Sequence, residues 1–304
     1  MLPFKVHILG CGSALPTLRH NASAQVVEAH SNLFLVDCGE GTQREMRRCH
    51  IAMSRINHIF ISHLHGDHCF GLPGLLTTLA MLGRRGEIHI YAFAELQQTF
   101  APLLAQHLKG AELYPVFHNI RHEGFETIYE NNSFFVKTLP LRHRVPCVGF
   151  VFQEKKPLPH IRRDMIDFLQ IPHYAINDIK QGVGWIADDG TFYPHERLVT
   201  PNHPPRKYVY MSDTLPCLEH IEVVKGVDLL YHEATFAEDR AVRAIETCHS
   251  TARQAAHFAL QAKVKQLLIG HYSARYLDET PLLDEARSVF PNTIAAQEGL
   301  VVEV

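Results

Sequence analysis

The stretch HLHGDH at residues 63–68 follows the apolar, strand-like run IFIS at residues 59–62, and it decides how the rest of the chain is interpreted. Crowded histidines repel one another when charged, and each polar group loses hydration when buried. A divalent metal removes this cost, since zinc accepts neutral imidazole nitrogens and carboxylate oxygens. His63 and His65 can face one ion, while Asp67 and His68, beyond the glycine bend, can face a second. The stretch therefore predicts a two-metal site.

Three more residues of ligand type follow apolar runs later in the chain: His143, Asp213 and His271. Taken alone, each could be a polar residue that caps a strand end. Two ions need more ligands than residues 63–68 supply, so together they complete a set in which the two oxygens of Asp213 can bridge the ions. Asp37 also ends a strand, and we expect it to orient a ligand histidine through a hydrogen bond.

Strands and helices alternate in both halves of the chain, and several strands end in a ligand-type residue. This pattern predicts a layered α/β fold with the site along one edge of the sheets. The predicted strands are 4–9, 25–28, 33–36, 88–91, 127–129, 134–138, 148–152, 208–211, 228–231 and 266–269; the predicted helices are one after residue 42, and 71–82, 95–108, 237–245 and 251–262.

The region 155–207 breaks this alternation. It contains seven prolines and no strong hydrophobic periodicity, but it also holds the only tryptophan, Trp185, which argues against simple disorder. We therefore predict one domain over residues 1–304, with an inserted arm at residues 155–207.

Composition narrows the class of protein further. Hydrophobic residues make up 46% of the 304 residues and charged residues 20%, as in ordinary globular proteins. The net charge of -3 indicates no general affinity for nucleic acid, so any such affinity must come from a local patch. Seven cysteines without a C-x-x-C pair fit a reducing, cytoplasmic location. No apolar run of about 18 residues is present, so we expect no membrane span.

The order of these ligand-type residues resembles the metallo-β-lactamase superfamily, which implies a four-layer αβ/βα sandwich with two metals at its edge. Four shorter stretches resemble ribonuclease Z, an endonuclease family that matures tRNA 3′ ends: GCGSALP (10–16), DCGEGTQ (37–43), HEATF (232–236) and HSTA (249–252). The likeness covers the whole chain. It implies two Zn²⁺ per subunit, one bound by His63, His65 and His143 and the other by Asp67, His68 and His271, with Asp213 shared.

The resemblance also implies a reaction. The protein would remove the 3′ trailer of precursor tRNA, leaving a 3′-hydroxyl on the tRNA and a 5′-phosphate on the trailer. Asp67, a ligand that can accept a proton from water, is the expected general base. His249 is the expected general acid, oriented by Glu233. The family's enzymes are often dimers, so we also expect a homodimer.

The predicted arm departs from the family's pattern, which usually includes a glycine- and lysine-rich stretch. Only Lys180 and Gly182 match it here, and eight basic residues between 154 and 207 face seven acidic ones. Two alternatives to tRNA cleavage therefore stay open. One is a dinuclear zinc phosphodiesterase for a small ester, and the other is a non-enzymatic RNA-binding protein, against which the complete ligand set argues. A β-lactamase is disfavoured because the shared ligand is Asp213 and not a cysteine.

Overall fold

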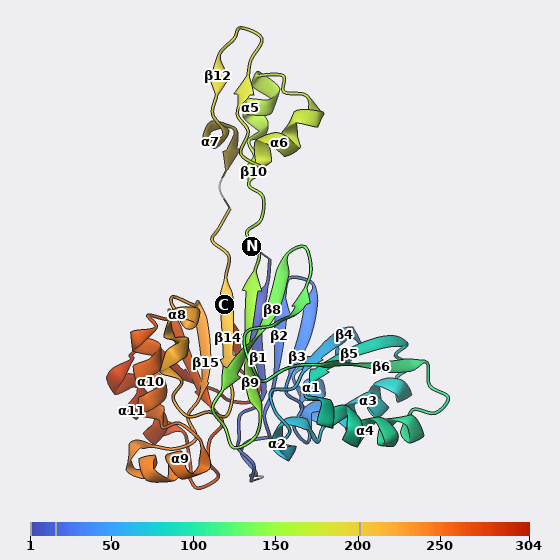
Figure 1. Cartoon of the computed structure of the whole chain (residues 1–304), viewed down its shortest axis with the longest axis vertical. Coiled ribbons are helices and arrows are strands. Elements are labelled where there is room, and N and C mark those ends of the chain that lie inside the picture. The colour runs from blue at the N-terminus through green and yellow to red at the C-terminus, as the bar shows by residue number, and fades with distance from the viewer. Residues whose placement is uncertain (1, 16, 201) are drawn as a thin grey trace. The chain divides into compact units, whose positions relative to one another are not determined.

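A computed structural model describes residues 2–15, 17–200 and 202–304 (Figure 1). The chain forms two compact units. The larger one, here called the body, comprises the residues up to Glu130, Val136–Phe152 and Lys207–Val304. The smaller one, here called the arm unit, comprises Asn131–Phe135 and Gln153–Arg206.

The first sheet of the body has the strand order β18-β1-β2-β3-β4-β5-β6. Strands β3 to β6 are parallel, whereas β1 is antiparallel to both β2 and β18. Its strands are β1 (Phe4–Gly10), β2 (Ala24–Ala29), β3 (Asn32–Val36), β4 (Ile56–Phe60), β5 (Gly86–Ala92), β6 (Leu113–Asn119) and β18 (Val301–Glu303).

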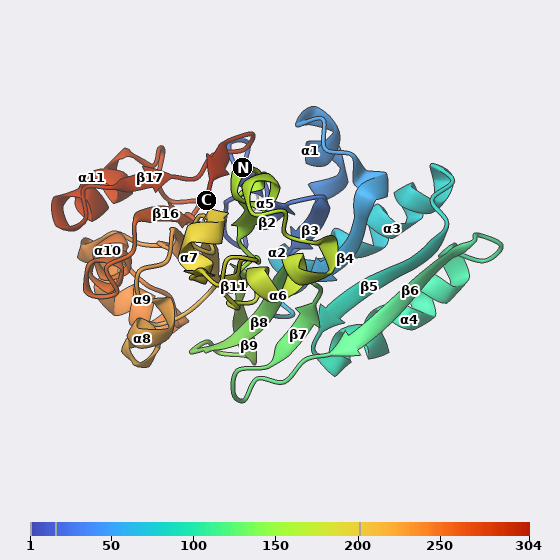
Figure 2. The ribbon, with the colours of Figure 1, turned by 90° about the horizontal axis from the view of Figure 1, so that it is seen from above.

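Helices cover the outer face of this sheet. Figure 2 shows α3 and α4 running along β5 and β6, and their leucines share one buried cluster with the isoleucines of β4 and β5. The helical segments of this half are α1 (Thr42–Arg48), η1 (Met53–Arg55), α2 (Gly66–Cys69), α3 (Leu72–Met81) and α4 (Ala94–His107).

The second sheet has the strand order β17-β16-β15-β14-β9-β8-β7, with β14 to β17 parallel. Its strands are β7 (Thr127–Glu130), β8 (Phe134–Leu141), β9 (Cys147–Glu154), β14 (Lys207–Met211), β15 (Leu229–Glu233), β16 (Gln266–Gly270) and β17 (Thr293–Ala295). Its helical segments are η3 (Leu218–His220), α8 (Ile221–Val224), η4 (Glu238–Arg240), α9 (Ala241–Thr247), α10 (Ala252–Gln261) and α11 (Thr280–Val289).

Aromatic side chains join the two sheets face to face. The rings of Phe60 and Phe150 are centred 5.6 Å apart, and those of Phe34 and Phe152 5.9 Å apart. Because helices α10 and α11 pack on the second sheet as α1 and α4 do on the first, the body is a four-layer αβ/βα sandwich. The predicted fold class is confirmed.

The predicted elements are found with shifted ends, except that 237–245 divides into η4 and α9. The elements of the body that were not predicted are β6, β17, β18 and α11, together with the short segments η1, α2, η3 and α8. Strand β6 contains Pro115 and lies at the edge of its sheet, the position where a sheet tolerates proline. No helix in the described part of the chain combines the length and the apolar character that a membrane span requires.

The arm unit is built from short elements around a small core. Its buried core residues are Ile171, Ala175, Ile179, Leu198 and Val199. At its base, the buried carboxylate of Glu154 forms an ion pair with Arg206 at 2.7 Å. Its elements are β10 (His160–Ile161), α5 (Arg163–Phe168), η2 (His173–Ala175), α6 (Ile176–Lys180), β11 (Trp185–Ile186), β12 (Phe192–Tyr193), α7 (His195–Leu198) and β13 (Val199–Thr200).

Candidate metal centre

All seven residues predicted as ligands meet at one edge of the sandwich. They form two groups, within each of which every donor atom lies within 4.8 Å of the others, and Asp213 belongs to both. The first group is His63, His65, His143 and Asp213, and the second is Asp67, His68, Asp213 and His271.

The first group is held together by the loop after β4 and the loop after β8. His65 Nδ1 lies 3.0 Å from His63 Nε2 and 3.3 Å from His143 Nε2. Oδ2 of Asp213 lies 3.6 Å from His63 Nε2 and 3.8 Å from His143 Nε2. Three imidazole nitrogens and one carboxylate oxygen therefore face a common point.

The second group uses the other oxygen of Asp213. Its Oδ1 lies 3.4 Å from His68 Nε2 and 3.2 Å from His271 Nε2. Oδ2 of Asp67 lies 3.4 Å from each of the same two nitrogens. Because each oxygen of Asp213 faces a different group, this carboxylate is placed to lie between two ions.

The chemistry of the donor atoms fits metal ions. His68 Nε2 is buried and has no hydrogen-bond partner, although buried polar atoms are normally paired. Burial holds the pKa of His63, His65 and His143 below the ordinary value, which favours the neutral form that coordinates metals. For His68, burial also lowers the pKa, but Asp213, Asp67 and Asp37 outweigh it and raise the pKa. This concentration of negative charge stabilises a cation.

A second layer of hydrogen bonds orients the histidines. Asp37 Oδ2 lies 2.8 Å from His68 Nδ1, and the hydroxyl of Tyr210 donates to the same oxygen at 2.6 Å. Ser62 donates to Asp37 through its backbone N–H and its hydroxyl, at 2.7 and 2.9 Å. His143 Nδ1 lies 2.9 Å from the carbonyl oxygen of Cys248. Hydrogen-bond partners of this kind fix the tautomer and the orientation of a metal-binding imidazole.

The backbone near these ligands is unusual. Asp37 and His271 adopt φ values of 55° and 63°, a left-handed region that non-glycine residues rarely occupy. Gly71, between α2 and α3, lets the backbone approach the loop after β3 closely, because a Cβ at this position would lie 2.0 Å from the carbonyl oxygen of Gly39. Such strain persists where the surrounding structure enforces it, and it concentrates at functional sites.

His249 lies beside both groups. Its ring stacks on His271 with centroids 5.2 Å apart, and its centroid is also 5.2 Å from that of His143. Its Nδ1 lies 2.8 Å from Oε1 of the fully buried Glu233. Burial alone would lower the pKa of His249, but the charge and hydrogen bond of Glu233 outweigh it and raise the pKa to about 9.

Glu233 also connects His249 to His271, one of the candidate ligands. The Thr235 hydroxyl donates to Glu233 Oε2 at 2.6 Å and lies 2.8 Å from His271 Nδ1. Ser62, Tyr210 and Thr235 were not predicted from the sequence as partners of the site. Ser62 directly precedes the 63–68 stretch and Thr235 lies within HEATF at residues 232–236, whereas Tyr210 lies inside an apolar strand, where no local pattern distinguishes it.

Several known proteins resemble this chain in sequence or in fold. Residues 4–158 match the family described as "Anti-Pycsar protein Apyc1". Ribonuclease Z of Bacteroides thetaiotaomicron is 51% identical over 304 residues, which cover 100% of this chain and 96% of that protein. The structure of human tRNase Z, short form, matches with a TM-score of 0.72 and 26% identity over 98% of each chain. The metallo-beta-lactamase fold protein YhfI from Bacillus subtilis matches with a TM-score of 0.70 at 19% identity, over 99% of this chain and 100% of that one.

Proposed function

The chain belongs to the ribonuclease Z family, and from this premise we propose that it is a metal-dependent endoribonuclease that removes the 3′ trailer of precursor tRNA. The products would be a tRNA with a 3′-hydroxyl and a trailer with a 5′-phosphate. The observation that carries the proposal is the meeting of seven ligand-type side chains in two groups that share Asp213, with His249 beside them.

We propose that His63, His65 and His143 hold one zinc ion, that Asp67, His68 and His271 hold the other, and that Asp213 binds both. When bound, the ions supply activation of a water molecule and neutralisation of phosphate charge. Asp67 is assigned as the general base, because its carboxylate lies among the ligands and can accept a proton from that water.

His249 is assigned as the general acid. The departing 3′ oxygen of the ribose needs a proton, and a histidine that Glu233 keeps protonated can donate one. Glu233 orients the imidazole through Nδ1, which leaves Nε2 for the substrate. Thr214 N–H and Thr235 N–H, both donating to Glu233 at 3.0 Å, hold the carboxylate in place.

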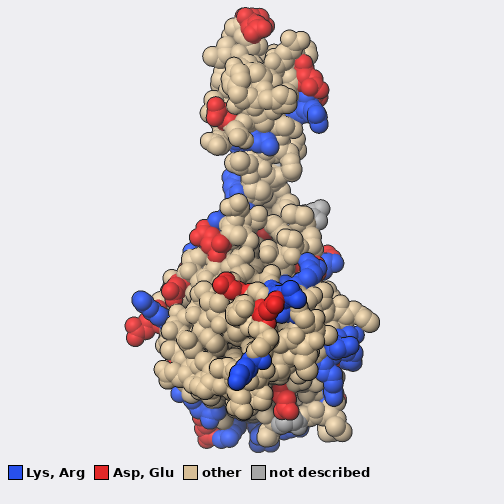
Figure 3. Space-filling model, turned by 90° about the vertical axis from the view of Figure 1, so that its right-hand side faces the viewer, with Lys and Arg blue, Asp and Glu red and all other residues tan. Residues whose placement is uncertain are grey.

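The arm unit is proposed to contact the tRNA away from the metals. It contains a pocket of about 690 Å³ whose wall includes Lys156, Lys180, Gly182 and His195. Figure 3 shows acidic and basic side chains mixed on the visible face, without a broad basic surface. Recognition of a folded RNA by shape and by a few phosphate contacts suits such a surface better than uniform electrostatic attraction.

Three arginines of the body are free to meet phosphates. Arg142, by contrast, forms an ion pair with Glu219 at 2.8 Å. Within the part of the chain that the structure describes, Arg44, Arg47 and Arg144 have no carboxylate partner, and Arg144 acts electrostatically on both His65 and His249. Arg144→Ala should reduce the salt slope of tRNA binding by about one ion, whereas Arg142→Ala should leave it unchanged.

We further propose that the protein works as a cytoplasmic homodimer in which one subunit's arm unit serves the other subunit's metals. Sedimentation would measure the dimer. Mixing a subunit that lacks the arm unit with an Asp213→Ala subunit should restore cleavage if the arm acts across the dimer.

One assay separates tRNA cleavage from hydrolysis of a small ester, the second candidate function. Purified protein is incubated with precursor tRNA that carries a 3′ trailer and, separately, with a chromogenic phosphodiester, and the RNA ends are identified. A trailer released with a 5′-phosphate supports the proposal. Rapid turnover of the small ester with intact precursor tRNA would favour the phosphodiesterase.

A further inference from the structure

A cluster of thiol, imidazole and carboxylate lies outside the candidate metal centre, where three distant parts of the sequence meet. Cys11 follows β1, His20 lies in the loop before β2, and Glu298 lies shortly before β18. The Sγ atom of Cys11 is 3.3 Å from His20 Nδ1 and 3.6 Å from Glu298 Oε1. His20 Nδ1 is 3.0 Å from Glu298 Oε2. We propose that Cys11, His20 and Glu298 form a third metal site, which takes a zinc-type divalent cation.

The spacing of these donor atoms matches that of the candidate metal centre. In the two groups described above, neighbouring donors lie from 3.0 Å apart, for His63 and His65, to 3.8 Å apart, for His143 and Asp213. In the Cys11 cluster, Sγ lies 3.3 Å from His20 Nδ1 and 3.6 Å from Oε1 of Glu298, and Nδ1 lies 3.0 Å from Oε2 of the same carboxylate. All three distances fall within that interval. Donor atoms at about 2.0–2.3 Å from one zinc ion have mutual separations of this size.

The two side chains beside Cys11 are also oriented as metal ligands are. A carboxylate of Glu279 lies 2.5 Å from the second ring nitrogen of His20, as Asp37 lies against the second nitrogen of His68. A carboxylate on the far nitrogen fixes a histidine's tautomer and orientation for a metal. The backbone N–H of Asn21 donates to Glu298 Oε1 at 2.8 Å, which leaves Oε2 facing His20.

A second trio of cysteine, glutamate and histidine in the same molecule is less suited to bind a metal ion. Cys217, Glu219 and His220 also bring their donor atoms together. Glu219, however, is 43% exposed and forms an ion pair with Arg142 at 2.8 Å. Because its carboxylate already has a cationic partner and faces solvent, this trio is not expected to hold an ion.

Charge and chemistry select the kind of ion. The thiol of Cys11 is fully buried, and the side chains of His20 and Glu298 are 10% and 7% exposed. Burial, followed by Glu298, raises the pKa of the Cys11 thiol, so the thiol keeps its proton without a metal. Burial lowers the pKa of His20, but Glu298 and Glu279 outweigh it and raise the pKa, so Nδ1 also carries a proton without a metal. On binding, the thiol proton and the Nδ1 proton pass to solvent, and the thiolate sulfur and Nδ1 bond to the cation with no change in oxidation state. A sulfur, a nitrogen and an oxygen donor suit zinc and disfavour magnesium and calcium.

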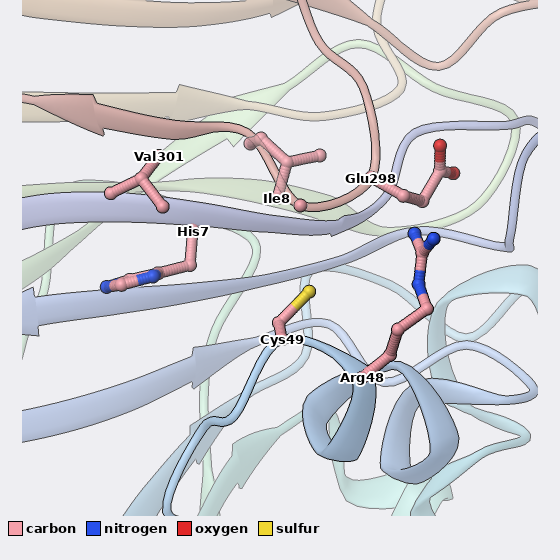
Figure 4. Close-up of a pocket in the computed structure, with 7 residues that line it drawn as sticks. His7, Ile8, Arg48, Cys49, Glu298 and Val301 are labelled. Carbon is pink, nitrogen blue, oxygen red and sulfur yellow. The ribbon is translucent and has the colours of Figure 1, made fainter.

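The site would fasten a loop next to the candidate metal centre. The carbonyl oxygen of Cys11 accepts a hydrogen bond from Tyr272 N–H at 2.9 Å, directly after His271. The loop that carries His20 lines a pocket of about 570 Å³ together with Asp67. Glu298 also lines a second pocket, of about 260 Å³, with Arg48 and Cys49 (Figure 4).

The test counts metals and detects the sulfur ligand. Full-length protein is produced in cobalt-supplemented minimal medium, and bound cobalt is measured by elemental analysis beside the near-ultraviolet thiolate-to-cobalt charge-transfer band. None of the seven side chains of the candidate metal centre is a cysteine, so a cobalt–sulfur band must come from elsewhere. We expect three cobalt ions per chain and the band in the unaltered protein. Cys11→Ser should lose the band and one ion, whereas Cys217→Ser should lose neither.

Other results would overturn the proposal. A protein with two ions and no sulfur band would show that the Cys11 cluster holds no metal. A band that survives Cys11→Ser would assign the sulfur to another cysteine. Because Cys11 is buried, His20→Gln serves as a second variant should Cys11→Ser fail to fold, and it should also lose one ion while the other two remain.

Discussion

The body and the arm unit differ in how tightly chemistry constrains their residues. In the body, Asp213 has to present two oxygens to two groups of histidines, and Asp37, Ser62 and Tyr210 have to hold His68 in place. A single altered atom type would leave a buried group unpaired. In the described part of the arm unit, a core cluster of five buried residues is surrounded by turns and very short elements. Residues that coordinate metals are therefore recognisable in a sequence, whereas residues that shape an RNA-binding surface are much less so.

The substitution Asp213→Ala tests most directly whether the side chains of the body bind two metal ions. Because this carboxylate belongs to both groups, its loss should reduce zinc content and abolish cleavage of every substrate. Elemental analysis and the tRNA assay measure both effects. Asp239→Ala, which changes an exposed carboxylate on η4, is the matched control and should behave as the unaltered protein does. An Asp213→Ala protein that cuts at the normal rate would contradict the proposed centre.

His249→Ala separates proton transfer from metal binding. Both zinc ions should remain, while tRNA cleavage should slow by about 10²–10⁴-fold, the usual contribution of general acid–base catalysis. A phosphodiester with a nitrophenol leaving group should be affected much less, because that leaving group departs without a proton. The control is His257→Ala, an exposed position on α10.

Two outcomes would remove the assigned role of His249. Loss of zinc would make His249 a ligand or a support for His271. Equal losses on the tRNA and on the nitrophenyl ester would indicate a role in positioning the substrate rather than in protonating the leaving group.

The candidate metal centre of the body can be predicted from the sequence for a physical reason. Parallel strands end at the same edge of a sheet, so the ligand-type residues that follow β14 and β16 in the second sheet lie close together. The loop after β4 meets them from the first sheet, which packs face to face with the second. The supporting hydroxyls escape notice because one serine, threonine or tyrosine has no spacing that marks it. Cys11, His20 and Glu298 escape for a related reason, because 287 residues separate the first from the last and their meeting depends on the pairing of β1 with β18.

Deleting most of the arm unit tests whether this unit contributes to tRNA binding. Replacing residues 156–204 by a short flexible linker keeps the Glu154–Arg206 ion pair at the base and all seven ligand-type residues. Cleavage of precursor tRNA should fall by about 10²-fold, because a second attachment point typically strengthens binding by at least that factor. Hydrolysis of the nitrophenyl ester should be unchanged.

A matched variant shows whether charge or shape carries the arm's contribution. Lys156→Ala with Lys180→Ala removes two cations from the wall of the arm pocket without shortening the chain. If phosphate contacts dominate, this variant should reproduce much of the loss and reduce its salt dependence. An arm-less protein that processes tRNA normally would contradict the arm's role and favour the small-ester alternative.

The smallest expected effect concerns the pH dependence of tRNA cleavage, which the site in the body determines. Glu233 raises the pKa of His249 to about 9 against the opposing effect of burial. An acid has to carry its proton, so the part of tRNA cleavage that depends on His249 is present below this pKa and is lost as the pH rises through it. Glu233→Gln removes the negative charge, lowers the pKa of His249, and should move the alkaline fall in kcat/KM to lower pH.

The nitrophenyl ester provides the control, because its leaving group needs no acid and its alkaline limb should stay in place. Zinc content and circular dichroism are measured first, since Glu233 also accepts hydrogen bonds from Thr214 and Thr235. An unshifted alkaline limb in a folded, zinc-loaded Glu233→Gln protein would show that the proton comes from another group.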